Sequence, residues 1–262
     1  MLYDVPTWVV VFGLLLLSLA ANELGFRYGR SRQGRESELS KTVSNTLKGS
    51  IFALVALLLA FSFSATSTRY DMRQRLVLDQ ANAIGTAYLR AGLLGDSSRA
   101  KIRGTLRQYV DIRLEHFRAG YHTARGAELQ QEIERLMDGL WKEVERENAA
   151  NPEAVRTSLI VPAVNDVIDL SSSRVWANRN HLPDPVLVLL LGSVIISSLL
   201  LGHSSGQAAQ RHPGLWLASN AVLALVLYVV LDFDRPKRGL ILIDQTPLIE
   251  LQASLDRDGG KA

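Results

Sequence analysis

The histidines and acidic residues are the groups that could act in catalysis or hold a metal, and their spacing supports neither. Five histidines are present and none stands four residues from another, so the paired face of a helical zinc site is missing. The chain has no Walker A loop and no GxSxG serine elbow. Without cysteine it has no thiol nucleophile. We expect no enzyme activity, no catalytic residue, no cofactor and no metal.

Two groups of charged residues stand where hydrophobic segments end. Arg69, Asp71 and Arg73 follow the second such segment, and Asp234 and Arg235 follow the last. We call these five residues the interfacial charge cluster. Opposite charges at such short spacing indicate ion pairs between spans or between subunits. The alternative is that they only anchor the span ends at the membrane surface.

Hydroxyl side chains are dense at the end of the second hydrophobic segment. Hydroxyls all round a helix do not suit lipid on every side, so they predict protein neighbours or water. Two interpretations remain open: hydrogen bonds between helices, and the wall of a water-lined pore. Two polar residues lie inside other spans, Asn220 and Glu23. They predict an interhelical hydrogen bond or a side chain that reaches the span's end, and the alternative is a role as an ion ligand. The hydroxyl residues are Ser62, Ser64, Thr66, Ser67 and Thr68.

Four apolar segments are long enough to carry these residues across a membrane. Each approaches the roughly 20 residues that a helix needs to span the hydrocarbon core. Only Asp4 is charged before the first segment, so we expect an uncleaved span there and not a signal peptide. The hydrophilic part is balanced in charge, which argues against a nucleic-acid partner. The predicted spans are residues 6–26, 49–67, 185–203 and 213–232.

The long hydrophilic stretch between the second and third spans has the apolar periodicity of amphipathic helices. The absence of proline from 47 to 93 further predicts one continuous helix from the second span into this stretch. The three apolar stripes are Val77, Ala81, Ile84, Tyr88 and Ala91, then Ile102, Leu106, Tyr109, Arg113 and Phe117, then Leu129, Ile133, Leu136, Leu140 and Val144.

These elements predict an all-α, four-span membrane protein with an extramembrane helical bundle between spans two and three. The first transmembrane hairpin would occupy 1–68, the helical domain 69–182 and the second hairpin 183–234. The tail, 235–262, would pack on the domain or on a neighbouring subunit, since its apolar residues would otherwise be exposed.

Three segments resemble the bacterial bestrophin-like family of membrane proteins: FSFSATSTRYDMR at 61–73, DQANAIGTAYLR at 79–90 and LDFDRPKRG at 231–239. The resemblance extends from about 50 to 254. The family is distantly similar to bestrophins, which are pentameric anion channels whose second span lines the pore. It implies a multi-pass protein of the cell inner membrane with a cytosolic domain. Charge alone does not orient the chain, because short-loop Lys and Arg are nearly equal on the two sides.

The same resemblance places a hydrophobic pore neck on Ala53, Leu57 and Phe61, with Ser64 also lining the pore. Spacings of four put the first three residues on one helix face. Five copies would form a constriction that conducts when wetted, although Ala53 is too small for a tight ring. The ordinary alternative is that these residues pack against a neighbouring span.

The leading functional hypothesis is therefore a homo-oligomeric, pentameric ion channel. Arg69 and its neighbours would bias it toward chloride or other small anions. The alternative is a non-conducting membrane scaffold or signal-relay protein.

Overall fold

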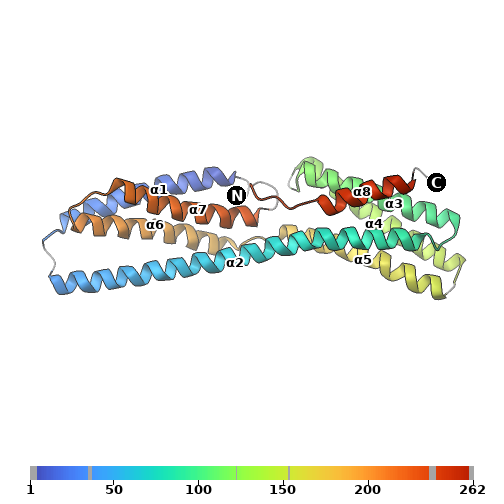
Figure 1. Cartoon of the computed structure of the whole chain (residues 1–262), viewed down its shortest axis with the longest axis horizontal. Helices are drawn as coiled ribbons and strands as arrows, with labels where there is room; N and C mark the ends of the chain where they lie inside the picture. The colour runs from blue at the N-terminus through green and yellow to red at the C-terminus, as the bar shows by residue number, and fades with distance from the viewer. Residues whose placement is uncertain (1–4, 35–36, 122, 153, 236–239, 260–262) are drawn as a thin grey trace. The chain divides into compact units, whose positions relative to one another are not determined.

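The computed structural model describes residues 5–34, 37–121, 123–152, 154–235 and 240–259, and within them the secondary structure is entirely helical (Figure 1). The helix predicted to continue from the second span is confirmed, and it begins at Glu38, earlier than the predicted start of that span at residue 49. The helices are α1 (Thr7–Ser31), α2 (Glu38–Ala91), α3 (Asp96–Ala119), α4 (Ala124–Ala150), α5 (Ala154–Arg179), α6 (Asp184–Gln207), α7 (Pro213–Asp234) and α8 (Thr246–Gly259).

The chain divides into two compact units. Unit 1 comprises Met1–Tyr70 and His181–Leu242, and unit 2 comprises Asp71–Asn180 and Ile243–Ala262. Unit 1 contains α1, the N-terminal part of α2, α6 and α7. These four helices are long and apolar enough to cross a membrane, and they correspond to the four predicted spans. The predicted fold class, an all-α protein with four spans, is confirmed.

Glycines set the packing of α1 against α6. A Cβ added to Gly25 would lie 2.0 Å from the carbonyl oxygen of Leu199, and one added to Gly202 would lie 1.9 Å from that of Asn22. Gly29 and Gly206 make backbone approaches of the same kind. Small residues spaced by four let membrane helices approach to backbone contact, where dispersion forces hold them together. The close α1–α6 pair is the packed centre of unit 1.

Polar side chains at membrane depth have the partners that the sequence suggested. The Ser198 hydroxyl of α6 donates to the Asn220 side-chain oxygen of α7 at 2.5 Å, which confirms the predicted interhelical hydrogen bond. Glu23 accepts from Arg27 at 2.9 Å and from Arg211 at 3.0 Å. The Asn220 and Glu23 side chains are therefore satisfied by another helix or at a helix end, as hydrocarbon surroundings require. The buried side-chain amide of Asn22 and the buried Ser197 hydroxyl have no hydrogen-bond partner among the described residues.

Unit 2 is a bundle built on the predicted apolar stripes. Their residues are buried, except that Phe117 and Leu136 are partly exposed. The C-terminal helix α8 packs in the same unit through Leu248 and Leu255, both buried. Its exposed side is tied to α3, since Gln252 donates to Asp111 at 2.5 Å. The hydrophobic stripes thus form one core, which positions the polar residues described below.

Candidate functional site

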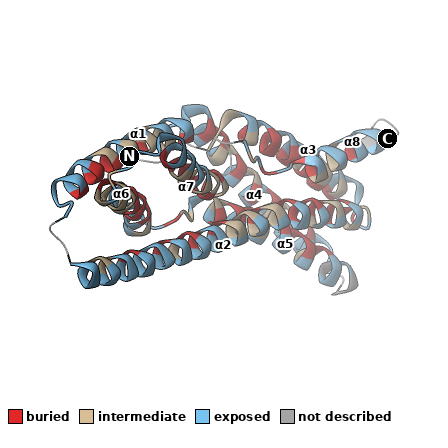
Figure 2. Cartoon of the chain, turned by 60° about the vertical axis from the view of Figure 1, so that its left-hand side comes forward, coloured by how far each residue is buried: buried red, intermediate tan, exposed pale blue. Residues whose placement is uncertain are grey.

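The four candidate pore residues all lie on the outside of the protomer. Ala53, Leu57, Phe61 and Ser64 are exposed, with 50% of Leu57 and 65% of Phe61 accessible. Figure 2 shows this N-terminal half of α2 largely as exposed surface. The stripe is therefore not sealed within a single chain.

The buried face of α2 lies on the opposite side of the helix. Between positions 50 and 70, its buried residues are Val55, Leu59, Ser62 and Thr66. At about 100° per residue, these four point within roughly 60° of one another. The stripe of 53, 57, 61 and 64 is centred about 180° away on the same projection. It points away from the helices that α2 contacts in its own chain.

Two of the predicted hydroxyls of α2, those of Thr66 and Thr68, bond to α2 itself. Thr66 donates to the carbonyl oxygen of Ser62 at 3.0 Å, and Thr68 donates to that of Ser64 at 2.9 Å. Such back-bonding lets hydroxyls sit in an apolar helix without a second helix as partner. Ser64 and Thr68 are on the exposed side, whereas Ser62 and Thr66 are buried. Only part of the hydroxyl set is therefore available to water beside the stripe.

Packing around α2 is sparse. In the most apolar 18-residue stretch of α2, 22% of the residues are buried, whereas 33% to 39% are buried in the corresponding stretches of the other three candidate spans. Two cavities share α2 as a wall: one of about 370 Å³ that includes Ile51, and one of about 510 Å³ that includes Phe52. An apolar helix left this bare needs lipid or other protein copies against it.

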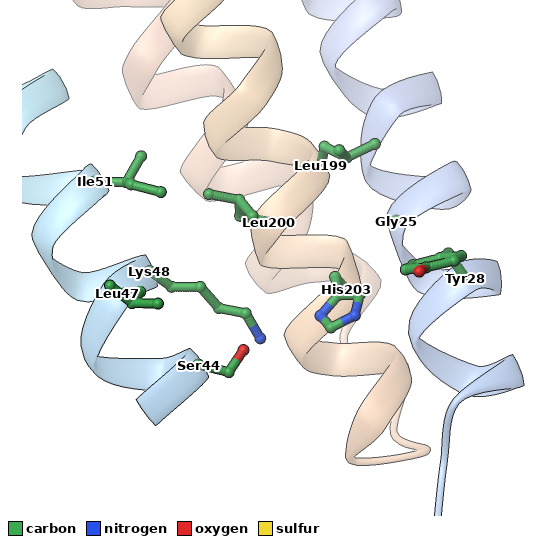
Figure 3. Close-up of a pocket in the computed structure, with 9 residues that line it drawn as sticks. All are labelled: Gly25, Tyr28, Ser44, Leu47, Lys48, Ile51, Leu199, Leu200 and His203. Carbon is green, nitrogen blue, oxygen red and sulfur yellow. The ribbon is translucent and has the colours of Figure 1, made fainter. Parts of the chain in front are cut away.

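Figure 3 shows the smaller cavity, bounded by α1, α2 and α6. Lys48 extends from α2 toward α6, where its Nζ donates to the side-chain oxygen of Gln207 at 3.2 Å. Tyr28 and His203 face each other across the α1–α6 side, with ring centroids 5.6 Å apart. The sequence argument missed Lys48. Its only signal is a lysine beside the start of an apolar span, which is also typical of a simple surface anchor.

In unit 1, two members of the interfacial charge cluster hold chain ends. The Asp234 carboxylate accepts the backbone N–H of Leu182, at 3.0 and 3.1 Å, just before α6 begins. Arg235 donates from Nη1 to the carbonyl oxygen of Val5 and, at 3.2 Å, to the hydroxyl of Thr7. Both residues are buried, and these contacts tie the end of α7 to the starts of α6 and α1.

The other members of the cluster have different surroundings. In unit 1, Arg69 is half-buried, and its Nη1 has no hydrogen-bond partner among the described residues. In unit 2, Asp71 is exposed, and Arg73 is buried and donates to the carbonyl oxygens of Ala177 at 3.0 Å and Asn180 at 2.9 Å, at the end of α5. The ion pairs expected between spans or subunits stay a prediction.

A neighbouring acid that the candidate set omitted has a similar structural role. Asp232 is fully buried, and its carboxylate accepts the backbone N–H groups of Leu240 at 3.2 Å and Ile241 at 2.8 Å. It thereby holds the chain that leaves α7. Its position next to the charged run was visible in the sequence, but its backbone partners were not.

These features define an all-helical membrane protein with a sparsely packed second span and polar anchors at the span ends. The bestrophin-like domain family matches residues 12–248. The chain belongs to the bestrophin-like family, as the sequence resemblance predicted. No curated protein sequence matches it.

Solved structures share the fold at low sequence identity. One variant of a bacterial bestrophin homologue from Klebsiella pneumoniae aligns with a TM-score of 0.70 and 12% identity, covering 96% of each chain. A second variant of that homologue gives 0.69 at 12% identity, covering 95% of this chain and 99% of the other. A further structure, named only as a membrane protein, gives 0.69 at 14% identity, covering 95% and 96%.

Proposed function

We propose that the chain is one subunit of a homopentameric ion channel of the cell inner membrane, with the stripe of Ala53, Leu57, Phe61 and Ser64 lining its axis. The observation that carries the proposal is the placement of this stripe: it is exposed, apolar and opposite the face by which α2 packs in its own chain. Membership of the bestrophin-like family supports it. So does the small buried share of α2, which identical copies around an axis would increase.

In this proposal, Leu57 and Phe61 form the narrow hydrophobic ring. The conduit is wider at Ala53, whose side chain is small, and Ser64 supplies a hydroxyl beside the ring. Ions pass only when water fills the ring, because a dry apolar constriction offers nothing to replace their hydration. Conduction of this kind is passive and needs no catalytic residue.

The anion preference rests on Arg69. It follows the second span, and its half-buried guanidinium has no carboxylate partner among the described residues, so its positive charge adds to the local potential. Five copies would place five such charges at one end of the second spans. Chloride would then be favoured over cations of similar size through the local potential.

Ion flux from liposomes containing the purified protein tests the proposal. Leu57→Ala and Phe61→Ala widen the ring and should raise anion flux severalfold. Leu225→Ala is the matched control, since Leu225 is an exposed leucine of another span, α7. Arg69→Gln should lower the chloride-to-sodium flux ratio. Silence of the wild type and of both ring variants would refute conduction, as would a monomer in detergent by mass photometry.

The second candidate function is a non-conducting scaffold or signal relay. It is favoured by α2, one 54-residue helix that contributes to both units without a break. This alternative predicts that no oligomer has an open axis and that a partner co-purifies with residues 69–182. A pentamer that conducts would exclude it as the main activity.

A further inference from the structure

Unit 2 contains buried arginines that the acids of its described residues do not neutralise. Arg113 of α3 and Arg174 of α5 are 2% and 4% exposed. Among the described residues, neither has a carboxylate oxygen within ion-pair distance. Burying a cation costs several kcal/mol unless an opposite charge compensates it. A bound anion would compensate two such cations in one helical core.

The partners of both arginines are neutral. Arg113 donates from Nε to the Tyr109 hydroxyl at 3.1 Å and from Nη2 to the backbone and side-chain oxygens of Ser171, at 3.1 and 3.3 Å. Arg174 donates to the amide oxygens of Gln80 at 2.5 Å and Gln245 at 3.3 Å. Burial, and then repulsion from Arg113, lowers the pKa of the Arg174 guanidinium.

A cavity adjoins this pair. Its volume is about 370 Å³, and α3, α4 and α5 supply its walls. Arg113 lines it, and the Nη1 of Arg113 has no hydrogen-bond partner within the described part of the chain. The other polar residues of the wall are rich in donors: His116, Tyr121, Gln130, Gln131, Asn178 and Arg179.

Two residues of this wall also border a space beside Arg174. Tyr121 and Asn178 also line a second space of only about 10 Å³, whose wall includes Arg73 and Arg174. This inner space is about the size of one water molecule. A ligand in the larger cavity would thus lie next to Arg113, with the remaining buried positive charge behind Tyr121.

One acid opposes these cations at the cavity. Glu134 is exposed on the α4 wall and accepts a hydrogen bond from the Gln130 amide at 2.9 Å. Arg113 and Arg179 outnumber it, so the wall is net positive even with His116 neutral. Guanidinium and amide N–H groups together match the paired oxygens of carboxylates and phosphates.

We propose that this cavity is a binding site for a small oxyanion of the carboxylate or phosphate type, with Arg113 as its buried cationic ligand. The site lies wholly in unit 2 and involves no residue of the exposed α2 stripe. The proposed oxyanion site therefore goes beyond conduction, and its test does not depend on whether the protein conducts ions.

Calorimetric titration of the full-length protein in detergent tests the site. The probes are inorganic phosphate and acetate, each added at constant ionic strength in sodium fluoride, with sodium chloride as the halide comparison. Saturable binding of either probe is expected, and the tighter one identifies the class. Arg179→Gln should weaken binding roughly fivefold to tenfold, since it removes a cation at the cavity's rim. Glu134→Gln should tighten binding, because it removes the one opposing charge.

Two further variants complete the test. Arg118→Gln removes an exposed arginine of α3 that does not line the cavity, and it should leave affinity unchanged. Arg113→Gln should abolish binding in protein that still elutes as the wild type does. If Arg113→Gln fails to fold, the proposal is tested by the other two variants, since Arg179→Gln should weaken binding and Glu134→Gln should tighten it. Binding that is absent, that is seen with chloride alone, or that is equal in all variants overturns the proposal.

Discussion

Adding one methyl group at Gly25 should break the contact between α1 and α6. In Gly25→Ala the new carbon would start 2.0 Å from the Leu199 carbonyl oxygen, whereas ordinary contact begins at 3.4 Å. The helices must therefore separate by about 1.4 Å at this point. The obstructing atoms are backbone, so no side chain can rotate away to relieve the overlap.

The expected loss of stability follows from that separation of the two helices. Overpacking of a well-packed core costs about 1–3 kcal/mol, and neighbouring contacts at Gly29, Gly202 and Gly206 loosen as well, so about 3 kcal/mol is a fair expectation. For a chain of this size, each kcal/mol lowers Tm by about 2–4 °C, which gives a fall of roughly 6–12 °C. Gly202→Ala, with 1.9 Å to the Asn22 carbonyl oxygen, should behave in the same way.

Gly13→Ala is the matched control, because a Cβ there would meet nothing within 4 Å. It lies on the same helix and should leave Tm unchanged or slightly raised, since alanine favours helix over glycine. Tm of each variant is measured in one detergent by the change in intrinsic fluorescence. Equal Tm values for Gly25→Ala and Gly13→Ala would refute the account of backbone contact.

Three further predictions concern single anchors. Asp234→Ala leaves a buried backbone N–H at the start of α6 without its acceptor and should cost about 1–3 kcal/mol in urea unfolding. Leu248→Ala should cost about 2–5 kcal/mol, whereas Ile249→Ala, at an exposed neighbouring position, should be nearly neutral. Hydrogen bonds, first from Ser98, hold the pKa of Glu147 below its ordinary 4.5. Their stabilisation is present above that value and lost as pH falls through the lower folded pKa, so Ser98→Ala should lower Tm at pH 7 but not at pH 2.

Much of the fold was predictable because each helix has a strong local signal. The apolar stripes of α2, α3 and α4 give the buried faces of unit 2, and the lengths of the apolar segments give the four candidate spans. The start of α2 was missed, since its first residues are polar and carry no apolar periodicity. Helix formation there is not driven by burial, so pattern alone does not locate it.

The polar interior was less predictable. Arg113 falls on an apolar stripe, so the sequence predicts that it faces the core. The sequence does not predict that it lies near Arg174, because that depends on how α3 packs against α5. Asp234 stands among opposite charges in the sequence, yet its described hydrogen bonds go to the backbone near α6. Partners separated by 50 residues or more are fixed by tertiary packing, and a single sequence does not specify them.

The glycine contacts between α1 and α6 also have a mechanical consequence. Where backbone touches backbone, no rotamer change can absorb a displacement, so the two helices move as one stiff piece. The N-terminal half of α2 has few such constraints and can tilt with little loss of packing. Any opening motion within unit 1 is then carried by α2. Spin-label distances from α1 to α6 should stay constant during that motion, while those from either helix to α2 change.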